Sequence, residues 1–138
     1  MSVLSFLLAG ASLLQVGAQT EVTVASENYR GWAGSYRLSN NRIEMVVVPQ
    51  IGRIMYLGFK GGKNLLWEHP SLGGVNGNLG QGEYQYFGGD KLWVAPQSNW
   101  NWPPDQSVDG APWEAKSTQD GIILTSPVSK KWGVQFER

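Results

Sequence analysis

The residues best suited to chemistry lie in one segment, between positions 88 and 105. It opens with Gly88-Gly89-Asp90-Lys91, continues through Trp93, and closes with Trp100-Asn101-Trp102-Pro103-Pro104-Asp105. Glycines allow a close approach of the backbone, charged groups can point into a cleft, and flat indole rings can offer their faces to a ring-shaped ligand. The mixture suits a sugar site better than a plain core. The alternative is a tryptophan-rich structural loop that packs on a β-sandwich.

The alternation of side chains along an extended chain assigns roles within this segment. Asp90 and Lys91 are adjacent, so their side chains point to opposite sides and only one of them can enter a pocket. We favour Asp90, because the preceding glycines let a ligand approach its carboxylate, which would accept hydrogen bonds from sugar hydroxyls. Trp100 and Trp102 would share one face and stack on a pyranose ring, whereas Trp93 is expected in the core.

Arg53, Lys91 and Asp105 complete the expected sugar-binding set. Arg53 is an unusual charge at the start of an apolar strand, and the alternative for it is a salt bridge at the rim of the pocket. The only histidine, His69, follows Glu68 directly, and adjacent residues of an extended chain make a poor acid–base pair. A structural or exposed role is therefore expected for His69. One histidine cannot build an ordinary zinc site, although carboxylates could hold calcium, and we expect no metal and no cofactor.

Length and composition restrict the class of protein. The chain has 138 residues, enough for one domain, and its 11 basic and 11 acidic residues form no block of like charge. We therefore expect neither nucleic acid nor an anionic membrane surface as a partner. Eighteen glycines and seven prolines favour a turn-rich β protein. The absence of cysteine excludes disulfides and thiol catalysis and says nothing about the compartment.

A period of two in the apolar residues predicts the elements that position these side chains. Segments 36–38 and 42–48 flank Asn40-Asn41 and predict a hairpin, and the continuous apolar run 46–48 indicates a strand covered on both faces. Segment 70–85 is glycine-rich without either period, which is typical of a long functional or mobile loop. Further strands are expected over 52–59, 64–67, 113–118, 122–125 and 133–138.

The predicted fold class is all-β, an antiparallel β-sandwich that is incomplete at its C-terminus. The last expected strand runs to Arg138 without a following turn, so one layer of strands would lack part of its cover. We expect the chain to be part of a longer protein or to pair with something else. The oligomeric state stays open.

The first eighteen residues differ in character from the remainder. An apolar run over 3–14 is too short to span a bilayer, and Val16-Gly17-Ala18 offers small residues to a signal peptidase. We predict a signal peptide over 1–18, cleavage before Gln19, a lead-in over 19–34, and a periplasmic or secreted protein without a membrane anchor. The n-region Met1-Ser2 lacks Lys and Arg, which counts against this interpretation and indicates either a start further upstream or a weak signal. The alternative is a buried N-terminal helix.

Residues 35–138 resemble the galactose-mutarotase-like superfamily, which includes aldose 1-epimerases and hexose-phosphate mutarotases. The resemblance rests on Gly52-Arg53-Ile54, on Asn64-Leu65-Leu66-Trp67, and on the segment from Phe87 to Pro96, which looks like the loop that borders the family's sugar pocket. A closer resemblance is to a bacterial family catalogued as domain of unknown function 4380. It rests on two sequence motifs, the segment that begins at Gly88 and Trp-Pro-Pro-Asp at 102–105. The resemblance implies a β-supersandwich fold, of which this chain is the N-terminal part, and a neutral sugar as ligand or substrate.

The departures from the family pattern narrow these implications. Hexose-phosphate mutarotases carry an arginine before the paired glycines, and here that position is Phe87, which disfavours a phosphorylated sugar. The family's catalytic histidine and glutamate lie on strands beyond Arg138, so no residue of this chain is assigned as catalytic acid or base. Three classes stay open: a mutarotase-like enzyme or its N-terminal part, a non-catalytic sugar-binding β-sandwich, and an exported structural β protein whose tryptophans only pack.

Overall fold

The computed structural model describes residues 21–77 and 84–138. Within these ranges the chain forms antiparallel β-strands, and its helical residues are two short 3₁₀ turns, η1 (Pro49–Ile51) and η2 (Gln97–Asn99). The all-β prediction is therefore confirmed. The expected signal peptide over 1–18 lies outside the described residues and stays a prediction.

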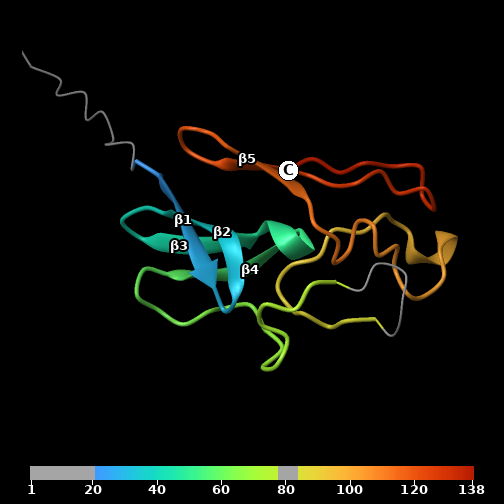
Figure 1. The fold of residues 1–138 in the computed structure, drawn as a ribbon, viewed down its shortest axis with the longest axis horizontal. Coiled ribbons are helices and arrows are strands. Elements are labelled where there is room, and N and C mark those ends of the chain that lie inside the picture. Colours follow the sequence, from blue (N-terminus) through green and yellow to red (C-terminus); the bar gives the residue numbers. More distant parts are fainter. Residues whose placement is uncertain (1–20, 78–83) are drawn as a thin grey trace, which may run out of the picture.

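The larger sheet has four strands that follow one another in sequence and in space (Figure 1). The hairpin predicted around Asn40 is confirmed by the antiparallel pairing of the strands on either side of it. The side-chain oxygen of Asn40 stabilises the turn, since it accepts the N–H groups of Arg42 and Ile43, both at 2.8 Å. Each strand is antiparallel to the next, as short turns require. The strands are β1 (Thr23–Tyr29), β2 (Trp32–Ser39), β3 (Ile43–Val48) and β4 (Arg53–Phe59).

The expected lead-in over 19–34 contains β1 and the start of β2. β1 pairs with β2 through a tight turn in which Arg30 and Gly31 have positive φ angles of 50° and 98°. Asn28 stabilises this turn, because its side-chain oxygen accepts the N–H of Gly31 at 2.9 Å. β1 lies at the edge of the sheet and carries mostly polar residues, so it lacked the apolar alternation that marked its neighbours.

The smaller sheet is the hairpin of β5 (Glu114–Ser117) and β6 (Ile122–Thr125), as expected from the sequence. The final segment runs beside β6, where Leu124 and Arg138 exchange two backbone hydrogen bonds of 2.7 and 3.0 Å. Its ladder is interrupted, so the predicted strand over 133–138 is reduced to isolated bridges. The predicted strand over 64–67 is also absent, because the Asn64 side chain takes the place of a strand partner on β4: it accepts Leu57 N–H at 3.1 Å and donates to Met55 O at 2.8 Å.

Two clusters of buried side chains lie on opposite faces of the larger sheet. One contains Val46 and Val48 together with Trp32, and the other places Val47 against Trp113 from the region of the smaller sheet. Successive residues of β3 point to opposite faces, so the apolar run over 46–48 is covered on both sides as predicted. Figure 1 shows the β5–β6 hairpin facing the larger sheet, with the irregular segment between β4 and β5 lying to one side.

Candidate functional site

Four aromatic side chains gather beside the sheet and form what we call the aromatic cluster: Tyr84, Tyr86, Trp93 and Trp102. The ring of Trp102 lies 4.7 Å from that of Tyr84 and 6.0 Å from that of Trp93, in both cases edge to face. Trp102 and Tyr86 are closer to parallel, with 20° between their planes and 6.3 Å between their centres. These two side chains are 48% and 53% exposed, so the cluster presents an aromatic surface to solvent.

The ammonium group of Lys91 lies among the rings of this cluster. Its Nζ atom is 4.8 Å from the centre of the Trp93 ring, 5.5 Å from that of Tyr84 and 6.0 Å from that of Tyr86, which are cation–π distances. Burial lowers the pKa of Lys91, and the charge of Arg53 lowers it further against an opposing effect of Asp109. Of the two adjacent charged residues, Lys91 is thus the one that joins the aromatic side chains.

Beneath the cluster lies a buried ion pair between Arg53 and Asp109. The two side chains are 2% and 3% exposed, and their closest nitrogen and oxygen atoms are 2.5 Å apart. The hydroxyl of Tyr84 donates to the other oxygen of Asp109 at 2.6 Å, and burial together with this hydrogen bond raises the pKa of Tyr84. Arg53 also donates to Gly88 O at 2.7 Å. The rim position considered for Arg53 is therefore wrong, since Arg53 is buried and holds the segments around residues 88 and 109 against β4.

Asp90 is engaged by the protein itself. Its carboxylate accepts the N–H of Ile54 at 2.6 Å and pairs with the guanidinium of Arg138, while its own N–H donates to Ile54 O at 2.9 Å. These contacts join the edge of β4 to the C-terminal segment. Asp90 and Lys91 do point to different surroundings, as the alternation predicted, but we place Asp90 outside the candidate site because both of its oxygens already have partners.

Trp100 and Trp102 do not share one accessible face. Trp100 is 6% exposed, donates from Nε1 to Val94 O at 3.0 Å, and packs against Trp93 and Trp132 with ring centres 5.6 and 5.2 Å apart. The backbone of Trp100 is extended, but its contacts with Trp93 and Trp132 hold its indole ring in the interior. Only Trp102 of the two offers a large exposed surface to a ligand.

Asp105 organises the loop in which it lies. Its carboxylate accepts hydrogen bonds from the N–H of Ser107 at 3.0 Å and from the hydroxyl of Ser129 at 2.5 Å. Burial acts to raise the pKa of Asp105, but the hydrogen bonds from Ser129 and Ser107 outweigh it and lower the pKa below its usual value. Asp105 therefore links this loop to the segment around Ser129 and does not join the aromatic cluster.

The lowered pKa of Asp105 predicts a pH-dependent contribution to stability. A carboxyl whose pKa is lower in the folded than in the unfolded state stabilises the fold above the unfolded value of about 3.9, and this stabilisation is lost as the pH falls through the folded pKa. Asp105→Asn should therefore lower the free energy of unfolding at pH 7 by about 1–2 kcal/mol and by less at pH 3. Urea unfolding at pH 7 and at pH 3 measures the loss of stability. Asp120→Asn, in an exposed turn, is the control, and an equal loss for Asp105→Asn at both values would contradict the prediction.

His69 and Glu68 are also bound to other residues. The imidazole Nδ1 of His69 accepts the N–H of Ser71 at 3.2 Å, in keeping with a structural role. The carboxylate of Glu68 accepts the hydroxyl of Tyr29 at 3.0 Å and lies 3.5 Å from the guanidinium of Arg30. Burial and the bond to Glu68 raise the pKa of Tyr29. The two adjacent residues thus form no acid–base pair with each other.

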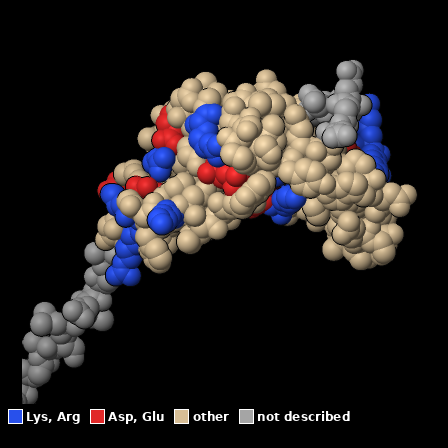
Figure 2. All heavy atoms as spheres, turned by 90° about the horizontal axis from the view of Figure 1, so that it is seen from below, with Lys and Arg blue, Asp and Glu red and all other residues tan. Residues whose placement is uncertain are grey.

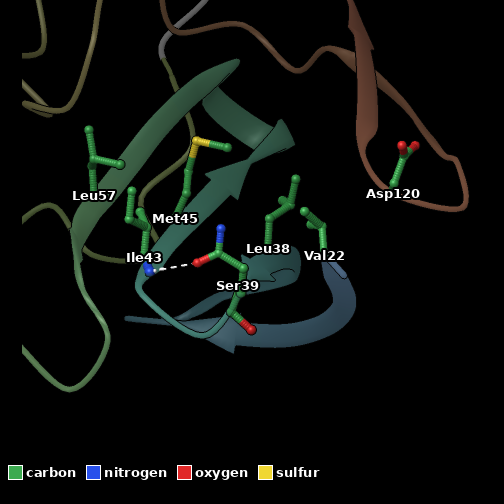
Figure 3. Close-up of a pocket in the computed structure, with 8 residues that line it drawn as sticks. Val22, Leu38, Ser39, Ile43, Met45, Leu57 and Asp120 are labelled. Carbon is green, nitrogen blue, oxygen red and sulfur yellow. Dashed lines mark hydrogen bonds between the residues drawn. The ribbon is translucent and has the colours of Figure 1, made fainter. Parts of the chain in front are cut away.

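A shallow hollow of about 240 Å³ lies on the open part of the larger sheet (Figure 3). Leu38, Met45 and Leu57 line it from three strands, and Asp120 faces it from the β5–β6 turn. The wall is mostly apolar, so it offers few partners to sugar hydroxyls. On the face drawn in Figure 2, most acidic and basic side chains lie over the left half, further basic side chains lie at the right edge, and much of the surface between them is uncharged. The aromatic cluster is thus the better sugar-binding candidate.

Among the sequence-predicted residues, the aromatic cluster brings together Lys91 and Trp102, with Arg53 buried beneath it. Sequence reasoning missed Tyr84, Tyr86 and Asp109. The alternation of Tyr84 and Tyr86 before the paired glycines could have pointed to two rings on one face, and the need of a buried Arg53 for a partner could have pointed to an aspartate.

Within residues 21–77 and 84–138, no three or more His, Asp or Glu side chains gather as metal ligands would. No helix in these ranges is long and apolar enough to cross a membrane. Comparisons of the chain with protein-family models, with curated proteins and with solved structures found no match.

Proposed function

We propose that this protein binds a non-phosphorylated sugar on the aromatic cluster, with the ring of the sugar stacked on Trp102. The observation that carries the proposal is the pair of exposed, nearly parallel rings of Trp102 and Tyr86. The C–H faces of a pyranose pack on such rings, and the rings are held in place by their contacts with Tyr84 and Trp93. Export from the cytoplasm belongs to the same proposal and rests on the apolar leader.

The proposal includes a β-sandwich related to the galactose-mutarotase-like superfamily. It is supported by two antiparallel sheets whose facing sides share a core that includes Val47, Trp113 and Leu124. Phe87, which stands where hexose-phosphate mutarotases carry arginine, is 2% exposed and packs against Trp32. A buried phenylalanine cannot bind phosphate, which supports the choice of a non-phosphorylated sugar.

Binding, and not turnover, is the activity that these residues support. Mutarotation needs an acid at the ring oxygen and a base at the anomeric hydroxyl. Asp109, the carboxylate beneath the cluster, is bound by Arg53 and Tyr84. The alternative of a purely structural protein is favoured by the buried Trp100, but it leaves the exposed Trp102 without a role.

Trp102→Ala tests the proposal. Loss of one stacking contact should weaken sugar binding by about 1 kcal/mol, or roughly fivefold in Kd. Isothermal titration calorimetry with a panel of neutral and acidic sugars measures this without relying on tryptophan fluorescence. Trp67→Ala is the matched control, because Trp67 is 62% exposed and lies outside the cluster.

Two results would contradict the proposed function. One is that no sugar in the panel binds the wild-type chain. The other is that Trp102→Ala and Trp67→Ala bind a sugar as tightly as the wild type does. Thermal unfolding of both variants shows whether any loss of binding reflects a loss of fold, since Trp102 also contacts Tyr84 and Trp93.

A further inference from the structure

The charge on the aromatic cluster narrows the kind of sugar that it suits. Lys91 places a cation among the same rings that Trp102 contacts, namely Tyr84, Tyr86 and Trp93. A ligand stacked on Trp102 would therefore lie in the neighbourhood of an ammonium group. The faces of aromatic rings attract a cation without using up its N–H donors.

Lys91 has no acidic partner in the part of the chain that the structure describes. None of the ion pairs among those residues includes it, and its ammonium donates no hydrogen bond to them. The negative charge of Asp109 acts on Lys91, but this carboxylate is already neutralised by Arg53 at 2.5 Å and accepts a hydrogen bond from Tyr84 at 2.6 Å. Among the described residues, the charge of Lys91 is thus uncompensated and its donors are unused.

We propose that the sugar is a uronic acid, whose ring stacks on Trp102 and whose carboxylate pairs with the ammonium of Lys91. This inference rests on the proposed function and replaces the neutral sugar expected from the sequence by a sugar with one negative charge. In a uronic acid the carboxylate is attached directly to the pyranose ring, so one flat molecule combines a stacking face with an anion.

A carboxylate fits this surface better than a phosphate group does. The ammonium of Lys91 supplies one positive charge, which one carboxylate balances, whereas a phosphate monoester carries close to two negative charges at neutral pH. Arg53 cannot supply the second, because its guanidinium is 2% exposed and bound to Asp109 and Gly88 O. A sulfate ester shares the single charge, so it serves as a test of the geometry.

The experiment compares sugars that differ only at one carbon. D-galacturonate, its methyl ester and D-galactose are titrated into the full chain by isothermal titration calorimetry, and D-glucuronate and D-glucose form a second pair. A charge-assisted hydrogen bond should make each uronate bind about tenfold more tightly than its neutral counterpart. The ratio should fall with increasing salt, since exposed charges are screened.

Variants of Lys91 assign the preference to this residue. Lys91→Met keeps an unbranched side chain over the rings but removes the charge, and it should bring the ratio close to one. Lys91→Arg should keep most of the ratio because it keeps the charge. Lys116→Met, on the exposed side of β5, is the control and should leave the ratio unchanged.

The outcomes separate this inference from the proposed function. If uronates and neutral sugars bind equally, the uronic acid is wrong while sugar binding stands. If Lys91→Met keeps the preference for uronates, the pairing of the carboxylate with Lys91 is wrong. Galactose 6-sulfate or galactose 6-phosphate binding more tightly than galacturonate would also overturn the choice of a carboxylate. If none of these sugars binds, the proposed function fails and this inference fails with it.

Discussion

Replacing Asp109 with alanine should lower the free energy of unfolding by about 3–5 kcal/mol, because the substitution leaves Arg53 as an unpaired charge in the interior. Both side chains of the pair are almost fully buried, so water cannot take the place of the lost carboxylate. The hydroxyl of Tyr84 would also lose its acceptor. Urea unfolding of the variant against the wild type measures the loss.

A partly exposed ion pair in the same protein is the control. Glu27 and Arg37 form such a pair, with side chains 26% and 30% exposed and 2.9 Å between the charged atoms, and Glu27→Ala should cost only about 0–1 kcal/mol. Where Asp109→Ala fails to fold, Asp109→Asn and the double variant Arg53→Met/Asp109→Leu extend the test. The double variant should be more stable than either single loss of a partner, since no charge is left unpaired. Equal stability losses for Asp109→Ala and Glu27→Ala would show that the buried pair has no special role.

The parts of the fold that followed from the sequence are those with a strong local pattern. The hairpin around Asn40 combined alternating apolar residues with a side chain that caps its own turn, so both signals agreed. The hairpin of β5 and β6 was found in the same way. β1 was not found, because an edge strand needs few apolar residues, and segment 64–67 was misassigned, because the Asn64 side chain replaces a backbone ladder.

The candidate site was harder to predict, because its arrangement depends on contacts between distant segments. Alternation correctly separated Asp90 from Lys91, but which of them faces the rings depends on β4, whose Ile54 binds Asp90 across 36 residues of sequence. The partner of Arg53 lies 56 residues away. The expected pairing of Trp100 with Trp102 failed because Trp100 packs in the interior against Trp93 and against Trp132, which lies 32 residues further along the chain. Residue types in this segment predicted an aromatic, charged surface, and only the tertiary contacts decide which members reach it.

The paired glycines of this segment lead to the second large expected effect. Sequence analysis interpreted them as space for a ligand, but the structure packs them against the protein's own backbone. A Cβ atom on Gly88 would lie 2.2 Å from the carbonyl oxygen of Trp67, and Gly88 has a φ angle of +90°. Gly88→Ala should therefore lower the free energy of unfolding by about 2–5 kcal/mol, the sum of an unfavourable φ angle and a backbone collision.

Gly61→Ala separates these two causes. Gly61 also has a positive φ angle, +69°, but a Cβ atom there would have no neighbour within 4 Å. Its substitution should cost only the conformational part, about 1–2 kcal/mol, so the difference between the two variants reports the collision alone. Thermal and urea unfolding measure both losses. If Gly88→Ala costs no more than Gly61→Ala, the contact between Gly88 and Trp67 can relax freely, and the close approach of the two segments does not require a glycine at position 88.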